Sequence, residues 1–265
     1  MDRRDFLAVV CLLPAGAALA APAAPAPAGL SLPAAINKAG RQRMLSQRTA
    51  KAWLMLVQGV LPEKAKSILA QSLHLFDQQL AELKVLPAGD EVRSAWLQVE
   101  QEWGRYRPLL ADIRSDAKAV WAGNEALLGA TQKLTLAYEK AAGTSAGRLV
   151  NLAGRQRMLS QRMAKAYFFR QMGVNAGPAG EMLDAAVKEF AKAQEELKAA
   201  AQNTAQIKTE LGLVEQQWFF FQNALSLREA ADRKKASTDV ATTSERILEQ
   251  MDAVVGLYEK IAREG

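Results

Sequence analysis

The chain has 265 residues, 49% of them hydrophobic, and its 34 basic residues outnumber its 28 acidic ones to give a net charge of +6. This length suits two domains. One histidine and one cysteine are too few for transition-metal or thiol chemistry, and the sequence contains no glycine-rich phosphate loop and no nucleophile elbow. We therefore predict that the protein is not an enzyme and that it binds no metal and no cofactor.

The first twenty residues predict an export signal that is removed from the mature protein. Arg3 and Arg4 precede an apolar run that extends to Leu19, which is typical of a twin-arginine signal, with a general secretory signal as the alternative. The small residues around the end of this run predict cleavage near Ala20. We expect a periplasmic protein whose mature chain has no membrane-spanning segment and does not bind nucleic acid.

A linker and two helical domains follow. Residues 21–33 contain four prolines among alanines and predict an extended linker. The only cysteine, Cys11, lies within the predicted signal, so we expect no disulfide in the mature protein. Beyond the linker, Ala, Leu, Gln, Glu and Lys dominate, which predicts helix throughout. We predict an all-α protein made of two consecutive antiparallel four-helix bundles, residues 34–143 and 144–265, related by internal duplication.

The first domain is predicted to contain four amphipathic helices. The first two cover residues 34–59 and 62–84, and they are separated by a glycine and a proline. The third begins after Asp90, which suits an N-cap, and Pro108 kinks it or ends its first part. The fourth covers residues 118–142.

The second domain repeats this order with slowly growing offsets. Phe76 corresponds to Phe190 at an offset of 114 residues, and Trp103 corresponds to Trp218 at 115, as small loop insertions would produce. Its helices are predicted over residues 145–173, 178–201, 204–231 and 236–263.

A ten-residue segment occurs twice and is the strongest signal in the chain. The letters AGRQRMLSQR stand at residues 39–48 and again at residues 153–162. Apolar core positions can change while a fold survives, and the regions around the two segments have diverged widely. An unchanged charged and polar segment is therefore hard to explain by packing alone. It predicts a functional site, with recent duplication as the alternative.

The helices that carry this segment are strongly basic. Residues 34–62 contain five basic residues and no acidic one, and residues 140–180 contain seven basic residues and no acidic one. Exposed helices usually mix both signs, because oppositely charged side chains three or four positions apart attract one another. The positive charge must therefore be balanced by other helices, by solvent or by a bound anion.

Small residues on one face of each basic helix predict a close helix–helix contact with an arginine at its centre. If the two helices pack together, Arg43 and Arg157 converge near a pseudo-twofold axis. Their mutual repulsion then favours a planar oxyanion between them, such as nitrate, nitrite or a carboxylate. The alternative is that these arginines are solvated or bridge neighbouring helices, as we expect for Arg41, Arg48, Arg155 and Arg162. The predicted ligand-binding set is Arg43, Arg157, Gly40, Gly154, Ser46, Ser160, Gln47 and Gln161.

The repeated segment also resembles a known family signature. Together with Asn37 or Asn151 it gives Asn-x-Ala-Gly-Arg-Gln-Arg-Met-Leu-Ser-Gln-Arg, which resembles the PilJ-type sensory domain of type IV pilus chemotaxis transducers. It is similar, too, to the P-box of NarX/NarQ-type nitrate/nitrite sensor kinases. This resemblance implies four-helix bundles that pair through their first helices and bind one anion between two related arginines, here Arg43 and Arg157. The Arg-Gln pair after the glycine matches the PilJ-type version.

These features predict an exported sensory protein. It would bind a small anion, with nitrate and nitrite as candidates, and it would act together with a membrane-bound sensor or chemotaxis protein. The alternative is a helical interaction module whose basic repeated helix docks a partner protein or an anionic surface without a small ligand. Arginine-to-lysine substitutions separate the two, because planar anion recognition needs the guanidinium fork and general charge attraction does not.

Overall fold

A computed structural model describes residues 30–86, 88–226 and 233–264. The predicted export signal and most of the predicted linker lie outside these residues. The described part of the chain forms the α-helices and the single 3₁₀ turn that follow: α1 (Leu32–Val57), α2 (Pro62–Lys84), α3 (Asp90–Tyr106), η1 (Arg107–Leu110), α4 (Ala117–Ala142), α5 (Ser145–Met172), α6 (Ala176–Lys198), α7 (Ala205–Ser226) and α8 (Arg233–Glu264).

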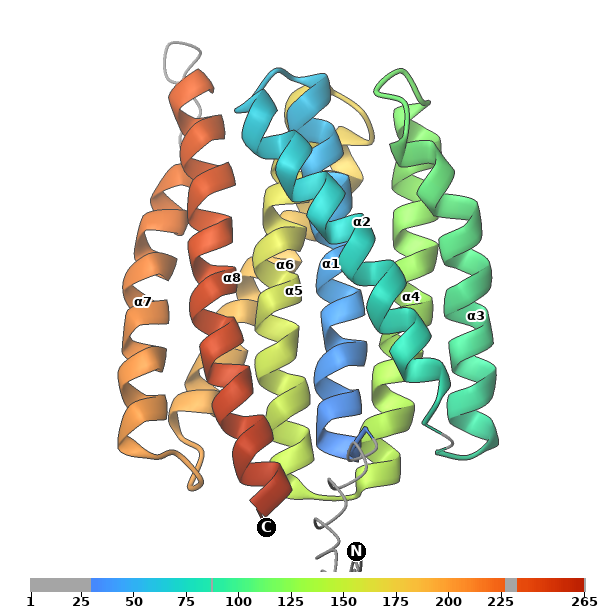
Figure 1. Cartoon of the computed structure of the whole chain (residues 1–265). Helices are drawn as coiled ribbons and strands as arrows, with labels where there is room; N and C mark the ends of the chain where they lie inside the picture. Colours follow the sequence, from blue (N-terminus) through green and yellow to red (C-terminus); the bar gives the residue numbers. More distant parts are fainter. Residues whose placement is uncertain (1–29, 87, 227–232, 265) are drawn as a thin grey trace, which may run out of the picture.

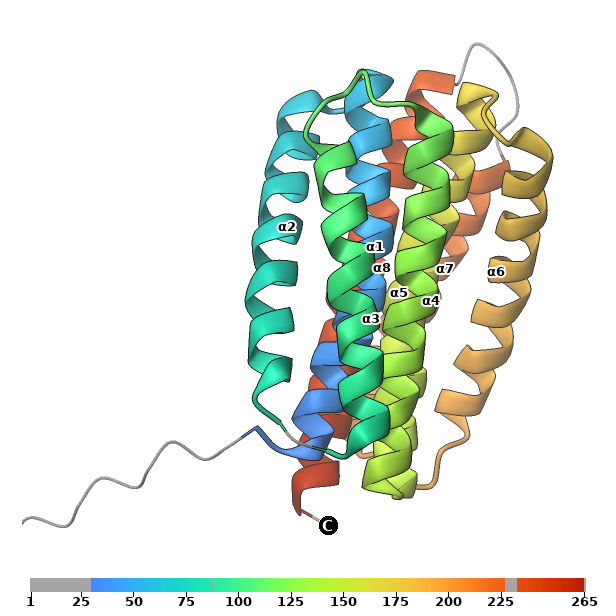
Figure 2. The same ribbon diagram turned by 90° about the vertical axis from the view of Figure 1, so that its right-hand side faces the viewer.

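The helices form two antiparallel four-helix bundles, which confirms the predicted fold class. Helices α1–α4 make the first bundle and α5–α8 the second, and in Figure 1 the outer helices α3 and α7 stand at opposite edges. The central helices α1 and α5 make the most extensive helix–helix contact of the described chain. Figure 2 shows the same layers from the side, with α2 and α6 at the two flanks. The repeated segment therefore lies along the line where the two bundles meet.

Helix ends follow the local sequence signals to within two or three residues where the structure describes them. Helix α6 begins at Ala176 and ends at Lys198, against the predicted 178–201, and α8 begins at Arg233, three residues earlier than predicted. Helix α1 begins two residues earlier than predicted, because Ser31 caps it and Pro33 fits a first helical turn, where no backbone N–H is needed. Helix α3 begins at Asp90 rather than after it. The N-cap is Gly89, whose φ of 95° favours glycine, and Asp90 instead places its charge in the first turn. Pro108 ends α3 as predicted, in the short turn η1.

The two cores are built from matching side chains. Phe76 stacks on Trp103 with ring centroids 3.9 Å apart, and Phe190 stacks on Trp218 at 4.4 Å. All four side chains are buried or nearly so. These are the pairs that the sequence offsets aligned, so the duplication extends from the motif to the packing of the second and third helices of each bundle. No helix in the described ranges is long and apolar enough to cross a membrane.

Candidate functional site

Long polar side chains of the repeated segment are buried where α1 meets α5. Gly40 on α1 and Gly154 on α5 each have guanidinium groups of both helices beside them. The small residues Ala39, Ala50, Ala153 and Ala164 are also fully buried.

Arg43 and Arg157 converge at this contact, and both are fully buried. A β-carbon placed on Gly40 would lie 3.2 Å from Nη2 of Arg43 and 3.8 Å from Nη2 of Arg157. One placed on Gly154 would lie 3.3 Å from Nη2 of Arg157 and 3.6 Å from Nη2 of Arg43. The two guanidinium groups therefore share the space beside the two glycines, which brings four of the eight predicted site residues together.

Each arginine reaches across to the other bundle. Nη2 of Arg43 donates to Oδ1 of Asn151 at 2.6 Å, and Nη2 of Arg157 donates to Oδ1 of Asn37 at 2.9 Å. Each also lies 3.3 Å from the backbone oxygen of the same asparagine. Nε of Arg43 and Nε of Arg157 are buried and have no hydrogen-bond partner among the described residues. Both arginines thus keep an unused donor at the centre of the molecule.

The pseudo-twofold symmetry fails at one position beside the arginines. Nη1 of Arg157 forms an ion pair with Asp252 on α8. Position 132 on α4 corresponds to position 252, and there Nη1 of Arg43 donates to the neutral Oε1 of Gln132 at 2.7 Å. Within the described chain, Arg43 donates only to neutral oxygens. It is therefore a fully buried cation without a carboxylate partner.

The presence of Gln132 in place of a carboxylate leaves the pKa of Arg43 without the opposing effect that Asp252 has on Arg157. Burial, helped by the nearby charges of Arg155 and Arg157, lowers its pKa from 12.5 to about 9, although the charges of Glu139 and Glu189 act to raise it. Burial also lowers the pKa of Arg157, but there the charge of Asp252 acts in the opposite direction. A buried charge without a partner costs several kcal/mol of stability, whereas a paired one recovers much of that cost. The site is thus short of one negative charge, on the side of Arg43.

Comparison with protein families gives a match over both halves of the chain. Residues 30–127 and residues 141–242 each match the family PilJ, described as the N-terminal region of type IV pili methyl-accepting chemotaxis transducers. The chain belongs to the PilJ family. No curated protein and no solved structure matches it in the corresponding comparisons. The arginine pair therefore lies between two tandem PilJ domains, at the contact of their first helices.

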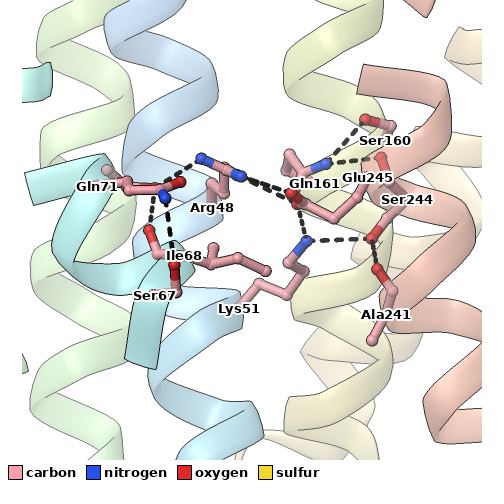
Figure 3. A network of polar contacts seen from close by, with 11 residues as sticks. Arg48, Lys51, Ser67, Ile68, Gln71, Ser160, Gln161, Ala241, Ser244 and Glu245 are labelled. Carbon is pink, nitrogen blue, oxygen red and sulfur yellow. Dashed lines mark hydrogen bonds and ion pairs between the residues drawn. The ribbon is translucent and has the colours of Figure 1, made fainter. Parts of the chain in front are cut away.

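A second polar layer lies one to two turns along the same helices of this tandem PilJ protein. Lys51 is fully buried and forms an ion pair with Glu245 on α8, and Nζ also donates to Oγ of Ser244 at 3.1 Å. Arg48 forms a bidentate contact with the same carboxylate and donates to Oγ of Ser72 at 3.1 Å. Figure 3 shows Arg48 and Lys51 of α1 both pointing toward Glu245. One carboxylate of the second bundle thus holds two cations of the first.

A pseudo-symmetric cluster repeats this arrangement with the two bundles exchanged, so that a carboxylate of the first bundle holds two cations of the second. Lys165 and Arg162 on α5 both pair with Glu125 on α4, and Nζ of Lys165 donates to Oδ1 of Asn124 at 2.8 Å. Burial lowers the pKa of Lys165 to about 8, although Glu125 acts to raise it. These crossed ion pairs join the first helix of each PilJ domain to the last helix of the other.

The remaining predicted site residues lie in this second layer. Ser46 and Ser160 donate to the backbone oxygens of Arg43 and Arg157, at 2.7 Å and 2.8 Å. Nε2 of Gln47 donates to Asn124 at 3.0 Å. Nε2 of Gln161 donates to the backbone oxygen of Ser244 at 2.8 Å. Their hydroxyl groups and amide N–H donors are thus engaged within the protein, while Oε1 of Gln161 is buried without a hydrogen-bond partner among the described residues. A role in ligand binding stays a prediction for these four residues.

The basic side chains outside the centre bridge helices, as expected. Arg41 pairs with Asp252 and Arg155 pairs with Glu189, and each is only partly exposed. The acidic partners stand on α2, α4, α6 and α8, far from the basic segments in sequence. Other helices therefore balance most of the positive charge that α1 and α5 carry.

The carboxylate of Glu245 gives the fold a defined acid sensitivity. Burial acts to raise the pKa of Glu245, but the charges and hydrogen bonds of Lys51 and Arg48 outweigh it and lower the pKa from 4.5 to about 2. A group with a lowered folded-state pKa stabilises the protein above its unfolded pKa, and this contribution is lost as the pH falls from about 4.5 to about 2. The advantage in unfolding free energy of wild type over Glu245→Gln should therefore shrink by roughly 2–3 kcal/mol across that window. Urea unfolding of both proteins at several pH values measures it, and a constant difference would contradict the expected role.

Proposed function

We propose that this tandem PilJ protein is a sensory, ligand-binding protein of the periplasm whose ligand is a small oxyanion, with nitrate and nitrite as candidates. The observation that carries the proposal is the buried Arg43, which lies beside Arg157 and has a neutral Gln132 where the second domain has Asp252. An anion beside Arg43 would supply the missing charge. It could also accept from the unused Nε donors of both arginines.

Binding of an anion beside Arg43 would act on the contact between the two bundles, and this is how it could produce a signal. The arginines hold α1 and α5 together through the reciprocal contacts with Asn37 and Asn151. An anion that draws the guanidinium groups toward itself would weaken or shift these contacts and so alter the packing of the two bundles. A ligand changes a conformational equilibrium only through such differential contacts. A membrane-bound chemotaxis transducer or sensor is the partner that would receive the change, in keeping with the family description.

Thermal unfolding of the purified protein with different anions tests this function. Sodium nitrate, nitrite, sulfate, chloride and acetate are compared at one ionic strength, so that general salt effects cancel. A ligand that binds only the folded state at 100 times its Kd adds about 2.7 kcal/mol, which for a protein of this size raises Tm by roughly 5–10 °C. We expect a selective shift for one planar anion.

The arginine variants decide whether such a shift comes from the proposed site. Arg43→Lys keeps the charge and removes the planar fork, so the selective shift should disappear. Arg105→Lys is the matched control, because Arg105 is exposed on α3 and pairs only with Glu102 in the described chain. Equal shifts for all anions, or a selective shift that survives Arg43→Lys, would contradict the proposal.

The alternative of a basic docking face has less support from the geometry. Arg48, Lys51, Arg162 and Lys165 face the interior and are paired with Glu125 or Glu245. Docking on an anionic surface needs cations that are exposed and free to exchange partners. The repeated segment presents few of these, so we favour the small-anion function.

A further inference from the structure

A surface groove lies next to Gln132, the residue that accepts a hydrogen bond from Arg43. It lies between α4, α5 and α6 and has a volume of about 360 Å³, within the range of small-molecule pockets. Its lining combines polar and charged residues with apolar ones. The polar and charged residues are Glu125, Gln132, Arg155, Arg162 and Glu189, and the larger apolar residues are Leu128, Met158, Leu159 and Met182.

Gln132 connects this groove to the buried site. Its Oε1 accepts from Nη1 of Arg43 at 2.7 Å and from Nη1 of Arg155 at 3.1 Å. Arg43 is fully buried, whereas Gln132 and Arg155 are partly exposed in the groove. A group that replaced the Gln132 amide would therefore touch Arg43 directly while remaining connected to solvent. The groove is thus a route by which an anion can reach the uncompensated cation.

The second domain shows which group fits between two such arginines. A pseudo-equivalent groove of about 340 Å³ is lined by residues of α1, α2 and α8. There Oδ1 of Asp252 accepts from Nη2 of Arg41 at 3.0 Å and pairs with Arg157. Arg41 and Arg157 correspond to Arg155 and Arg43. The protein itself thus places a carboxylate at this position in one domain and an amide at the same position in the other.

We propose that the groove between α4, α5 and α6 binds a small aliphatic monocarboxylate whose carboxylate displaces the Gln132 side chain and lies between Arg43 and Arg155, as Asp252 lies between Arg157 and Arg41. This inference rests on the proposed function, because it names the anion and its route to Arg43. The alkyl chain lies along Leu128, Met158 and Met182.

The charges of the groove select one carboxylate rather than two. Arg155 already pairs with Glu189, and Arg162 shares Glu125 with the buried Lys165, so both carboxylates that line the groove are already paired. Arg43 lies beside the groove and has no ion pair in the described chain, and a single negative charge would balance it. A second carboxylate on the ligand would lie near Glu125 or Glu189 and be repelled.

Thermal unfolding with acetate, butyrate, hexanoate, succinate and nitrate tests the inference on the full protein. Each buried methylene adds about 0.8 kcal/mol, so the apparent affinity should rise about fourfold per methylene from acetate to hexanoate. Succinate should bind more weakly than butyrate, which has the same number of carbons and one charge fewer. The dissociation constants follow from the dependence of Tm on ligand concentration.

Filling the groove separates this inference from the function on which it rests. Gly129 is exposed in the groove, a β-carbon added there meets no atom within 4 Å, and the equivalent position carries Glu249. Gly129→Gln should therefore fold and should abolish the hexanoate shift. Gly104→Gln is the matched control, since Gly104 is an equally open helical glycine on α3.

Three outcomes are decisive. Chain-length dependence that is lost in Gly129→Gln and kept in Gly104→Gln supports the groove site. A nitrate shift that needs Arg43, with no chain-length dependence and no effect of Gly129→Gln, overturns the groove site and leaves the proposed function standing. No shift with any anion overturns both.

Discussion

Replacing Glu245 by glutamine is expected to lower the free energy of unfolding by about 3–5 kcal/mol. The carboxylate lies between Lys51, which is fully buried, and Arg48, which is 16% exposed. The variant leaves the ammonium of Lys51 in the interior without a counter-charge. Removing one partner of a buried ion pair costs far more than the pair contributes, because the remaining charge keeps its full desolvation penalty. Urea denaturation monitored by circular dichroism measures the change.

Two further variants identify the cause of this loss. Glu249→Gln removes an exposed carboxylate from the next turn of α8, and it should change stability by less than 1 kcal/mol. Adding Lys51→Met to Glu245→Gln should recover much of the loss, because methionine fills a similar volume and carries no charge. A double variant no more stable than Glu245→Gln would show that Lys51 is not the charge left uncompensated.

Replacing Gln132 by glutamate is expected to stabilise the protein by about 1–3 kcal/mol and to abolish the proposed response to anions. Glutamate has nearly the same shape as glutamine, and it would supply to Arg43 the carboxylate that Asp252 supplies to Arg157. The variant then carries its own permanent counter-ion. A ligand whose binding depends on the missing charge would have nothing left to compensate.

The control for this variant is Gln101→Glu, which makes the same change of charge on the exposed face of α3. It should leave both the stability and the anion response near the wild-type values. A Gln132→Glu variant that is destabilised, or that still shows a selective anion shift, would contradict the view that Arg43 lacks a counter-charge. Thermal unfolding with and without the most effective anion distinguishes these results.

Much of the fold could be predicted because its signals are local. Helix α2 has the predicted bounds, and the ends of α4 and α5 differ from prediction by at most one residue, since caps and glycines mark them. Helix α3 shows the limit of such signals. A glycine in an unusual conformation takes the capping position there, and the sequence alone favoured the neighbouring Asp90.

The site was predictable only in part. The repeated segment placed Arg43, Arg157 and the two glycines correctly together, because the identity of two helices implies a pseudo-twofold contact. Asn37 and Asn151 belong to the same motif, but their role as reciprocal acceptors follows only from the helix register. Glu125, Glu245 and Asp252 were missed. A signal was present, since the offset of 120 residues that relates Tyr138 to Tyr258 also aligns Glu125 with Glu245.

Short-range sequence patterns are enough to predict a duplicated helical domain with two arginines at its centre. These properties depend on periodicity, caps and a repeated segment, all of which are readable over short stretches of chain. Which charges are balanced depends instead on the tertiary fold. The acids that neutralise α1 and α5 stand on helices up to 211 residues away, as Arg41 and Asp252 show. Electrostatic balance depends on distances in space, so only the folded chain reveals that Arg43 has no carboxylate partner among the described residues.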